Sequence, residues 1–141
     1  MRVAIFLACA LLALCRSPAT AQAENPDPRG AVMCMWMIYS TLSQVADKCR
    51  PNADHQFRNA LRSGVKRMED FIIRNSDTTL EQIDQQKKLR AERSVAHHCA
   101  SSNEAFREFE RLRDTISISD LEKEIDRLIE VDRPPVWNPC L

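Results

Sequence analysis

Glycine is scarce in this chain, because only Gly30 and Gly64 occur among 141 residues. A β-rich fold of this size needs more turn glycines and alternating runs of β-branched residues, and neither is present. A glycine-rich phosphate loop and a serine in a nucleophile-elbow setting are missing as well. These absences predict an all-α fold and leave no recognisable catalytic motif, so we expect a protein that is not an enzyme.

Long apolar runs are also missing, except at the very start of the chain. Arg2 is followed by the apolar run Val3–Leu14, and small residues then recur at Ala19, Ala21 and Ala23. This pattern is typical of a secretory signal peptide, and the run is too short to serve comfortably as an uncleaved membrane anchor. We expect a signal peptide over residues 1–21, with cleavage after residue 23 as the alternative. Residues 22–29 then form a flexible leader and residues 30–141 a single helical domain.

The charges nearly cancel. Removal of Arg2 and Arg16 with the signal peptide leaves 18 of the 20 basic residues against 20 acidic ones, a net charge near −2. Nucleic-acid binding would call for a basic face, so no nucleic-acid partner is expected. No second apolar run follows, so the mature chain is expected to lack a transmembrane segment and to be periplasmic or secreted.

Four cysteines remain after cleavage: Cys34, Cys49, Cys99 and Cys140. An even number in an exported chain implies two disulfides. A zinc site is the competing interpretation, but it would need close pairs such as C-x-x-C, which are absent. We therefore expect disulfides and no metal or other cofactor.

Helix geometry favours one of the three possible ways to pair these cysteines. Cys34 and Cys49 would lie about 22 Å apart on one helix, whereas bridged Cα atoms must lie within about 7 Å. If successive helices alternate in direction, Cys49 and Cys99 lie at the same end of the bundle. An extended ten-residue tail reaches about 33 Å and can bring Cys140 back to Cys34. The predicted disulfides are Cys49–Cys99 and Cys34–Cys140.

The most apolar stretch of the mature chain is Ala31–Cys49. Its first half has almost no polar face, and such a helix belongs in the middle of a bundle. We predict a central helix over about residues 30–48, which ends before Pro51 because proline disfavours helix in the preceding residue.

A second helix is predicted from Asn52 or Asp54, either of which can cap it, to about Arg74. Its apolar positions recur at helical spacing. They are Phe57, Leu61, Val65, Met68 and Ile72.

Three capping boxes mark the starts of three more helices. They are formed by Thr78 or Thr79 with Glu81 or Gln82, by Ser101 with Glu104, and by Ser119 with Glu122. The first of these helices is expected over Leu80–His98 and to be the most solvated long helix, because Lys87 interrupts its apolar stripe. The predicted fold is a small disulfide-stapled bundle of four long helices and one short one. An extended proline-rich strap, residues 132–141, follows it.

Several side-chain groups are candidates for a site. Adjacent helical residues point about 100° apart, so His97 and His98 cannot easily chelate one ion, although His55 could approach one of them. We interpret them as surface histidines near a helix C-terminus. The helical carboxylates are interpreted as solvated ion pairs with Lys and Arg. They are Glu69, Asp70, Glu122, Glu124 and Asp126.

Two further groups could bind something. The cluster Met33–Tyr39 could line an apolar cavity, since methionine suits adaptable pockets, although such clusters usually form core. The basic ridge Arg50, Arg58, Arg62 and Lys66 is a candidate face for an acidic partner, with a solvated surface as the alternative.

Two short stretches resemble known families. Cys34 and Cys49 with Pro51 and the amphipathic helix after them resemble small helical periplasmic immunity proteins of the Tai type. Those proteins carry a glycine–tyrosine pair and a further glycine after the first cysteine, where this chain has Met35–Tyr39. Leu80–Ala96 resembles the first helix of helical chorismate mutases, but two lysines replace its paired leucines. The chain is assigned to neither family.

The sequence therefore predicts an exported, non-catalytic binding protein that acts through its surface on another envelope or secreted protein, like an inhibitor or immunity protein. The alternative is a carrier of a small apolar ligand in a Met- and Trp-lined bundle core, and an enzyme without a recognisable motif comes third.

Overall fold

The computed structural model describes residues 29–94 and 99–138 of the chain. They form five helices: α1 Val32–Cys49, α2 His55–Asn75, α3 Leu80–Ser94, α4 Glu104–Thr115 and α5 Ile118–Ile129. No strand occurs in these ranges, which confirms the predicted all-α bundle. α4 and α5 have 12 residues each, so the bundle has two short helices where one was expected.

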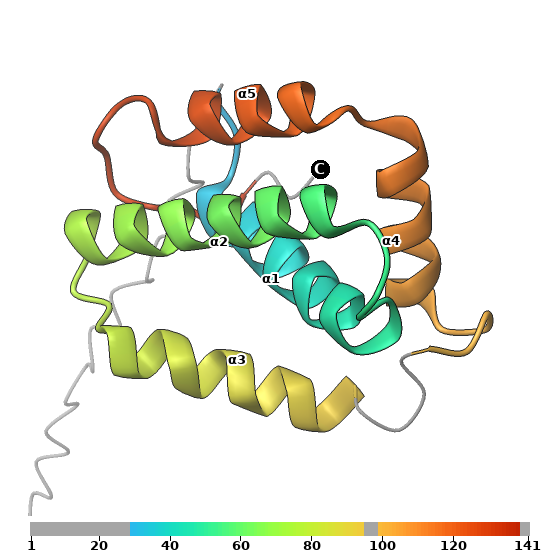
Figure 1. The fold of residues 1–141 in the computed structure, drawn as a ribbon. Coiled ribbons are helices and arrows are strands. Elements are labelled where there is room, and N and C mark those ends of the chain that lie inside the picture. Colours follow the sequence, from blue (N-terminus) through green and yellow to red (C-terminus); the bar gives the residue numbers. More distant parts are fainter. Residues whose placement is uncertain (1–28, 95–98, 139–141) are drawn as a thin grey trace, which may run out of the picture.

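α1 is the central helix, as its composition predicts. Buried side chains occur all around it, and it packs against α2, α3 and α4. In Figure 1, α1 runs behind α2, with α3 and α5 on either side of α2. α1 ends at Cys49, one residue later than predicted, and the next N–H, that of Arg50, still donates to the Ala46 carbonyl.

α2 packs with its predicted stripe inward. All five stripe residues, from Phe57 to Ile72, are at most 6% exposed. Gly64 adds a close approach to α5, because a Cβ at this position would lie 2.2 Å from Cδ1 of Ile125. The absence of a side chain at residue 64 therefore fixes how closely α5 can lie on α2.

Only one of the three predicted capping boxes is formed. Thr79 and Gln82 cap α3 reciprocally, at 2.8 and 3.2 Å between side-chain oxygen and backbone nitrogen. The other two predictions are wrong in register. α4 is capped by Asn103, which accepts from Phe106 N–H, and α5 by Ser117, which accepts from Asp120 N–H. Ser101 and Ser119 match the same pattern in sequence but lie two residues away from the caps that form.

The start of α2 also differs from the prediction. Asp54 precedes the helix in a left-handed conformation, with φ of 53°, and its side chain makes no capping hydrogen bond. Its carboxylate instead accepts from Arg113 of α4 at 3.1 Å. The Asp54 carboxylate thus forms an ion pair that links the start of α2 to α4 and does not cap α2.

After α5 the chain runs without helix through residues 131–138. Asp132 accepts from Arg74 at the end of α2, Arg133 donates to the Gly30 carbonyl, and Met33 N–H donates to the Val136 carbonyl. These contacts carry the segment, here called the strap (residues 131–138), back to the first turn of α1. Such a path was predicted for the tail.

The disulfide Cys49–Cys99 is present, with a Cα–Cα distance of 5.2 Å. It joins the end of α1 to the segment that follows α3. Cys34 is fully buried and also disulfide-bonded. Cys140 lies outside the described residues, as do the signal peptide, the leader up to residue 28 and His97–His98, so the predictions on them stay predictions.

Candidate functional site

Charged and aromatic side chains from three helices meet where α3 packs on α1 and α2. The Trp36 indole N–H donates to Oε1 of Glu69 at 3.3 Å, and Lys87 Nζ lies 2.9 Å from the same oxygen. The Glu69 side chain is 5% exposed and that of Lys87 33%. Such a buried carboxylate is tolerated because a cation and a second donor compensate its lost hydration.

The structure corrects two interpretations of the sequence here. Glu69 was taken as a solvated ion-pair carboxylate, and Lys87 as an interruption of the apolar stripe of α3. Both lie on inner faces, because Glu69 follows Val65 by one helical turn and Lys87 follows Ile83 by one turn. Each of these two charges interrupts the apolar inner face of its own helix, and the two charges pair with each other.

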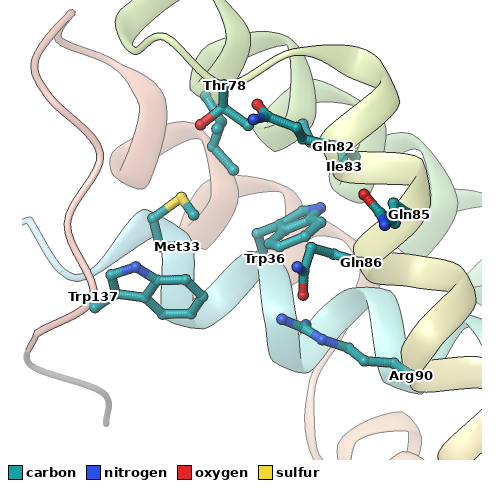
Figure 2. A pocket seen from close by; sticks show the side chains of 10 residues that line it. Met33, Trp36, Thr78, Gln82, Ile83, Gln85, Gln86, Arg90 and Trp137 are labelled. Atoms are coloured by element: carbon teal, nitrogen blue, oxygen red, sulfur yellow. The ribbon is translucent and has the colours of Figure 1, made fainter.

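A cavity of about 430 Å³ lies beside this contact, between α1, α3 and the strap. Its walls include the indoles of Trp36 and Trp137, the thioether of Met33 and polar side chains of α3. In Figure 2, Trp137 and Met33 lie across from the glutamines of α3, and Arg90 closes one end. The volume falls within the range of about 300–1,000 Å³ that is usual for small-molecule sites.

The two sides of the cavity differ in chemistry. The side made by α1 and the strap is aromatic and apolar, whereas α3 contributes the amides of Gln82, Gln85 and Gln86. The Gln82 amide oxygen accepts from Thr79 N–H, and the other two amides make no hydrogen bond with any described residue. Gln85 and Gln86 therefore offer both a donor and an acceptor to a bound molecule.

Arg90 lies at the border of the cavity with its guanidinium 5.1 Å from the centroid of the Trp36 ring. At this distance a cation is attracted to the face of the ring. Burial lowers the pKa of this guanidinium below its ordinary value. Arg90 thus helps to hold the Trp36 ring in the orientation that forms the cavity wall.

No family model, no curated protein and no solved structure matches this chain. The function of the cavity is therefore inferred from its own residues and contacts. Across residues 29–94 and 99–138, no helix combines the length and apolar character needed to cross a bilayer.

The predicted methionine cluster is divided between core and cavity. Met35, Trp36 and Tyr39 are buried in the core, and burial raises the pKa of the Tyr39 phenol, helped by the carboxylate of Glu124. The cavity lies at the edge of the core, next to Met33. Trp137 forms another part of the cavity wall, and this role could not be predicted from the sequence.

The candidate partner face Arg50, Arg58, Arg62 and Lys66 is not a continuous exposed ridge. Arg58 is only 8% exposed and donates to the carbonyls of Arg50 and Pro51 and to Asp47, so its place in the predicted face is wrong. The other three side chains reach the surface, and each is bonded to a neighbour. Whether they meet a partner stays a prediction.

The described residues contain no group of three or more His, Cys, Asp or Glu side chains placed to hold a metal ion. His55 is exposed at the first position of α2. Its proposed approach to His97 or His98 involves residues outside the described ranges.

Proposed function

We propose that this is an exported, non-catalytic binding protein that takes a small, partly apolar molecule into the cavity between α1, α3 and the strap. The observation that supports this best is the pairing of two indoles and a thioether on one wall with two available amides on the other. This is the mixture expected of a ligand site, where apolar walls supply affinity and a few polar groups supply orientation.

The ligand that fits this arrangement is a flat molecule with one polar edge. An aromatic or alicyclic ring can lie against Trp36 and Trp137, while Gln85 and Gln86 bond to its polar substituents. Export is supported by the Cys49–Cys99 disulfide, since such bonds persist in oxidising compartments.

The experiment is a fluorescence titration of the processed, oxidised protein with anilinonaphthalene sulfonate, followed by native mass spectrometry of protein isolated from its own host. The Trp137→Ala variant should weaken probe binding about tenfold or more, since an aromatic wall contributes about 1.5 kcal/mol or more. Val131→Ala is the matched control, because Val131 is also 45% exposed on the strap but does not line the cavity. Unchanged binding in Trp137→Ala, with no co-isolated molecule, would contradict the proposal.

Binding to another exported protein, the first function expected from the sequence, is the second candidate. Trp137 is 45% exposed at the rim of the cavity, and tryptophan is a frequent anchor in protein interfaces. In that case a pull-down from the envelope should yield one stoichiometric protein whose capture is lost in Trp137→Ala. The small-molecule proposal predicts no such protein.

A further inference from the structure

A second cavity, of about 290 Å³, lies between α1, α2 and α3 and shares no lining residue with the first. Its polar lining includes Ser40, Ser43 and Gln44 of α1, Glu69 of α2 and Lys87 of α3, and the charged side chains of Asp47, Arg62 and Lys66 complete it. Val65 adds an apolar wall. Its volume suits a molecule of one ring, at the lower limit of usual ligand sites of about 300 Å³.

Buried polar side chains are concentrated at this cavity. Among the described residues four polar or charged side chains are buried, and three of them, Ser40, Ser43 and Glu69, line it. Burying a polar group is unfavourable unless it finds a hydrogen-bond partner. Their concentration at one cavity therefore indicates a place where polar atoms meet a polar molecule.

Two polar atoms of the lining have no hydrogen-bond partner among the described residues, and neither is sealed off from solvent. The Ser40 hydroxyl donates to the Met37 carbonyl at 3.1 Å. By contrast, the Ser43 hydroxyl makes no hydrogen bond with any described residue, and neither does Oε2 of Glu69, whose Oε1 binds Trp36 and Lys87. Glu69 is 4% exposed, so a donor reaches Oε2 only from the cavity, whether as water or as a hydroxyl of a bound molecule.

Each charged side chain of the lining already has an oppositely charged neighbour. Lys87 is paired with Glu69, and Asp47 lies 2.8 Å from Arg58 and 3.9 Å from Arg62. Lys66, also part of the lining, is paired with Asp70. A charged ligand would have to compete with one of these pairs, whereas a neutral ligand leaves them intact.

We propose that this cavity binds a small neutral polyhydroxy molecule, a single sugar ring or a cyclic polyol. One hydroxyl donates to Oε2 of Glu69, and a neighbouring hydroxyl exchanges a hydrogen bond with Ser43. The Gln44 amide adds a donor and an acceptor, and Val65 contacts the C–H face of the ring. The site is distinct from the first cavity, since the two have no lining residue in common.

The test is a two-dimensional NMR titration of the oxidised protein with D-glucose and with myo-inositol. Parallel titrations use sodium acetate and methylammonium chloride at the same ionic strength. Few hydrogen bonds are available, so dissociation constants in the millimolar range are expected, with shifts centred on the amides around residues 40–47 and 65–69. Shifts confined to these amides with either polyol, and absent with both salts, would support the proposal.

Two matched variants separate binding from folding. Ser43→Ala removes the hydroxyl without adding bulk to the cavity, and should weaken polyol binding about five- to tenfold, corresponding to one hydrogen bond. Thr41→Val removes a hydroxyl of the same helix that donates to the Met37 carbonyl at 2.9 Å and does not line this cavity, and it should leave binding unchanged. Both should melt cooperatively. Equal affinities of the two variants, no polyol shifts up to about 0.1 M, or larger shifts with either ion would each overturn the proposal.

Discussion

Replacing Lys87 by methionine tests whether the buried Glu69 carboxylate depends on its cation. The change keeps the length of the side chain but leaves Glu69, 4% exposed, with only the Trp36 indole as a donor. An uncompensated buried charge costs about 3–5 kcal/mol. Because the Lys87 side chain is 33% exposed, water can replace part of its effect. We therefore expect a loss of about 1–3 kcal/mol in the free energy of unfolding, or about 5–15 °C in melting temperature.

The assay is thermal and urea unfolding followed by circular dichroism, with Lys88→Met as the control. Lys88 is exposed on the same helix, so its replacement should change stability by less than about 0.5 kcal/mol. Glu69→Gln should restore most of the loss in the Lys87→Met background, because it removes the buried charge while keeping an acceptor for Trp36. If Lys87→Met and Lys88→Met are equally stable, or the double variant is no more stable than Lys87→Met alone, the ion pair does not have the assigned role.

Three further changes have defined outcomes. Gly64→Ala should lower the free energy of unfolding by about 1 kcal/mol, after allowance for the higher helix propensity of alanine. Ile125→Val should restore the loss, because it removes the atom that lies 2.2 Å from the new Cβ. Equal urea midpoints for the single and double variants would contradict the close approach of α2 and α5. Replacing both Cys49 and Cys99 by serine should lower the free energy of unfolding by about 4 kcal/mol in the chain-entropy account, given their separation of 50 residues. Urea titration measures this loss. A loss below about 1 kcal/mol would show that other contacts hold the ends of the loop. Hydrogen bonds from Arg74 and Asn75 at the end of α2 hold the pKa of Asp132 below its usual value. The ionised carboxylate therefore stabilises the fold at pH values above the usual pKa, and this stabilisation is lost as the pH falls through the lower pKa of the folded state. Melting temperatures of the wild type and Asp132→Asn should therefore differ near neutral pH and converge in acid, and a constant difference would exclude this account.

Sequence periodicity was sufficient for the framework of the fold. The continuous apolar character of Met33–Tyr39 predicts a central helix, and the stripe Phe57–Ile72 predicts the buried face of α2. Helix direction and loop length together predicted Cys49–Cys99. In each case the information is local, or depends only on a helix having a fixed rise per residue.

Features that depend on contacts between helices were not predictable in this way. Ser101 and Ser119 match the capping-box pattern in the sequence, yet Asn103 and Ser117 accept the capping hydrogen bonds in the structure. Glu69 looked like any surface carboxylate until α3 brought Lys87 to it. Glu69 and Lys87 each occupy a position where the helical period places an inward-facing side chain. Two such positions with opposite charges would have suggested that the two residues form a pair.

The cavity is the least predictable feature, because it requires three segments from distant parts of the chain. Trp36 and Trp137 are 101 positions apart in sequence and become two walls of one space only through the path of the strap. Neither a composition nor a periodicity argument relates a residue in a proline-rich tail to the first turns of a helix.

α3 buries only one large apolar side chain, Ile83, yet it supplies a whole wall of the proposed binding site. The Cys49–Cys99 disulfide anchors the chain soon after this helix to the end of α1. If the chain is exported as proposed and oxidised only after transport, this anchor forms only at the destination. Under the same proposal, a precursor in a reducing compartment would lack the anchor and would hold the wall that α3 gives to the proposed site less firmly.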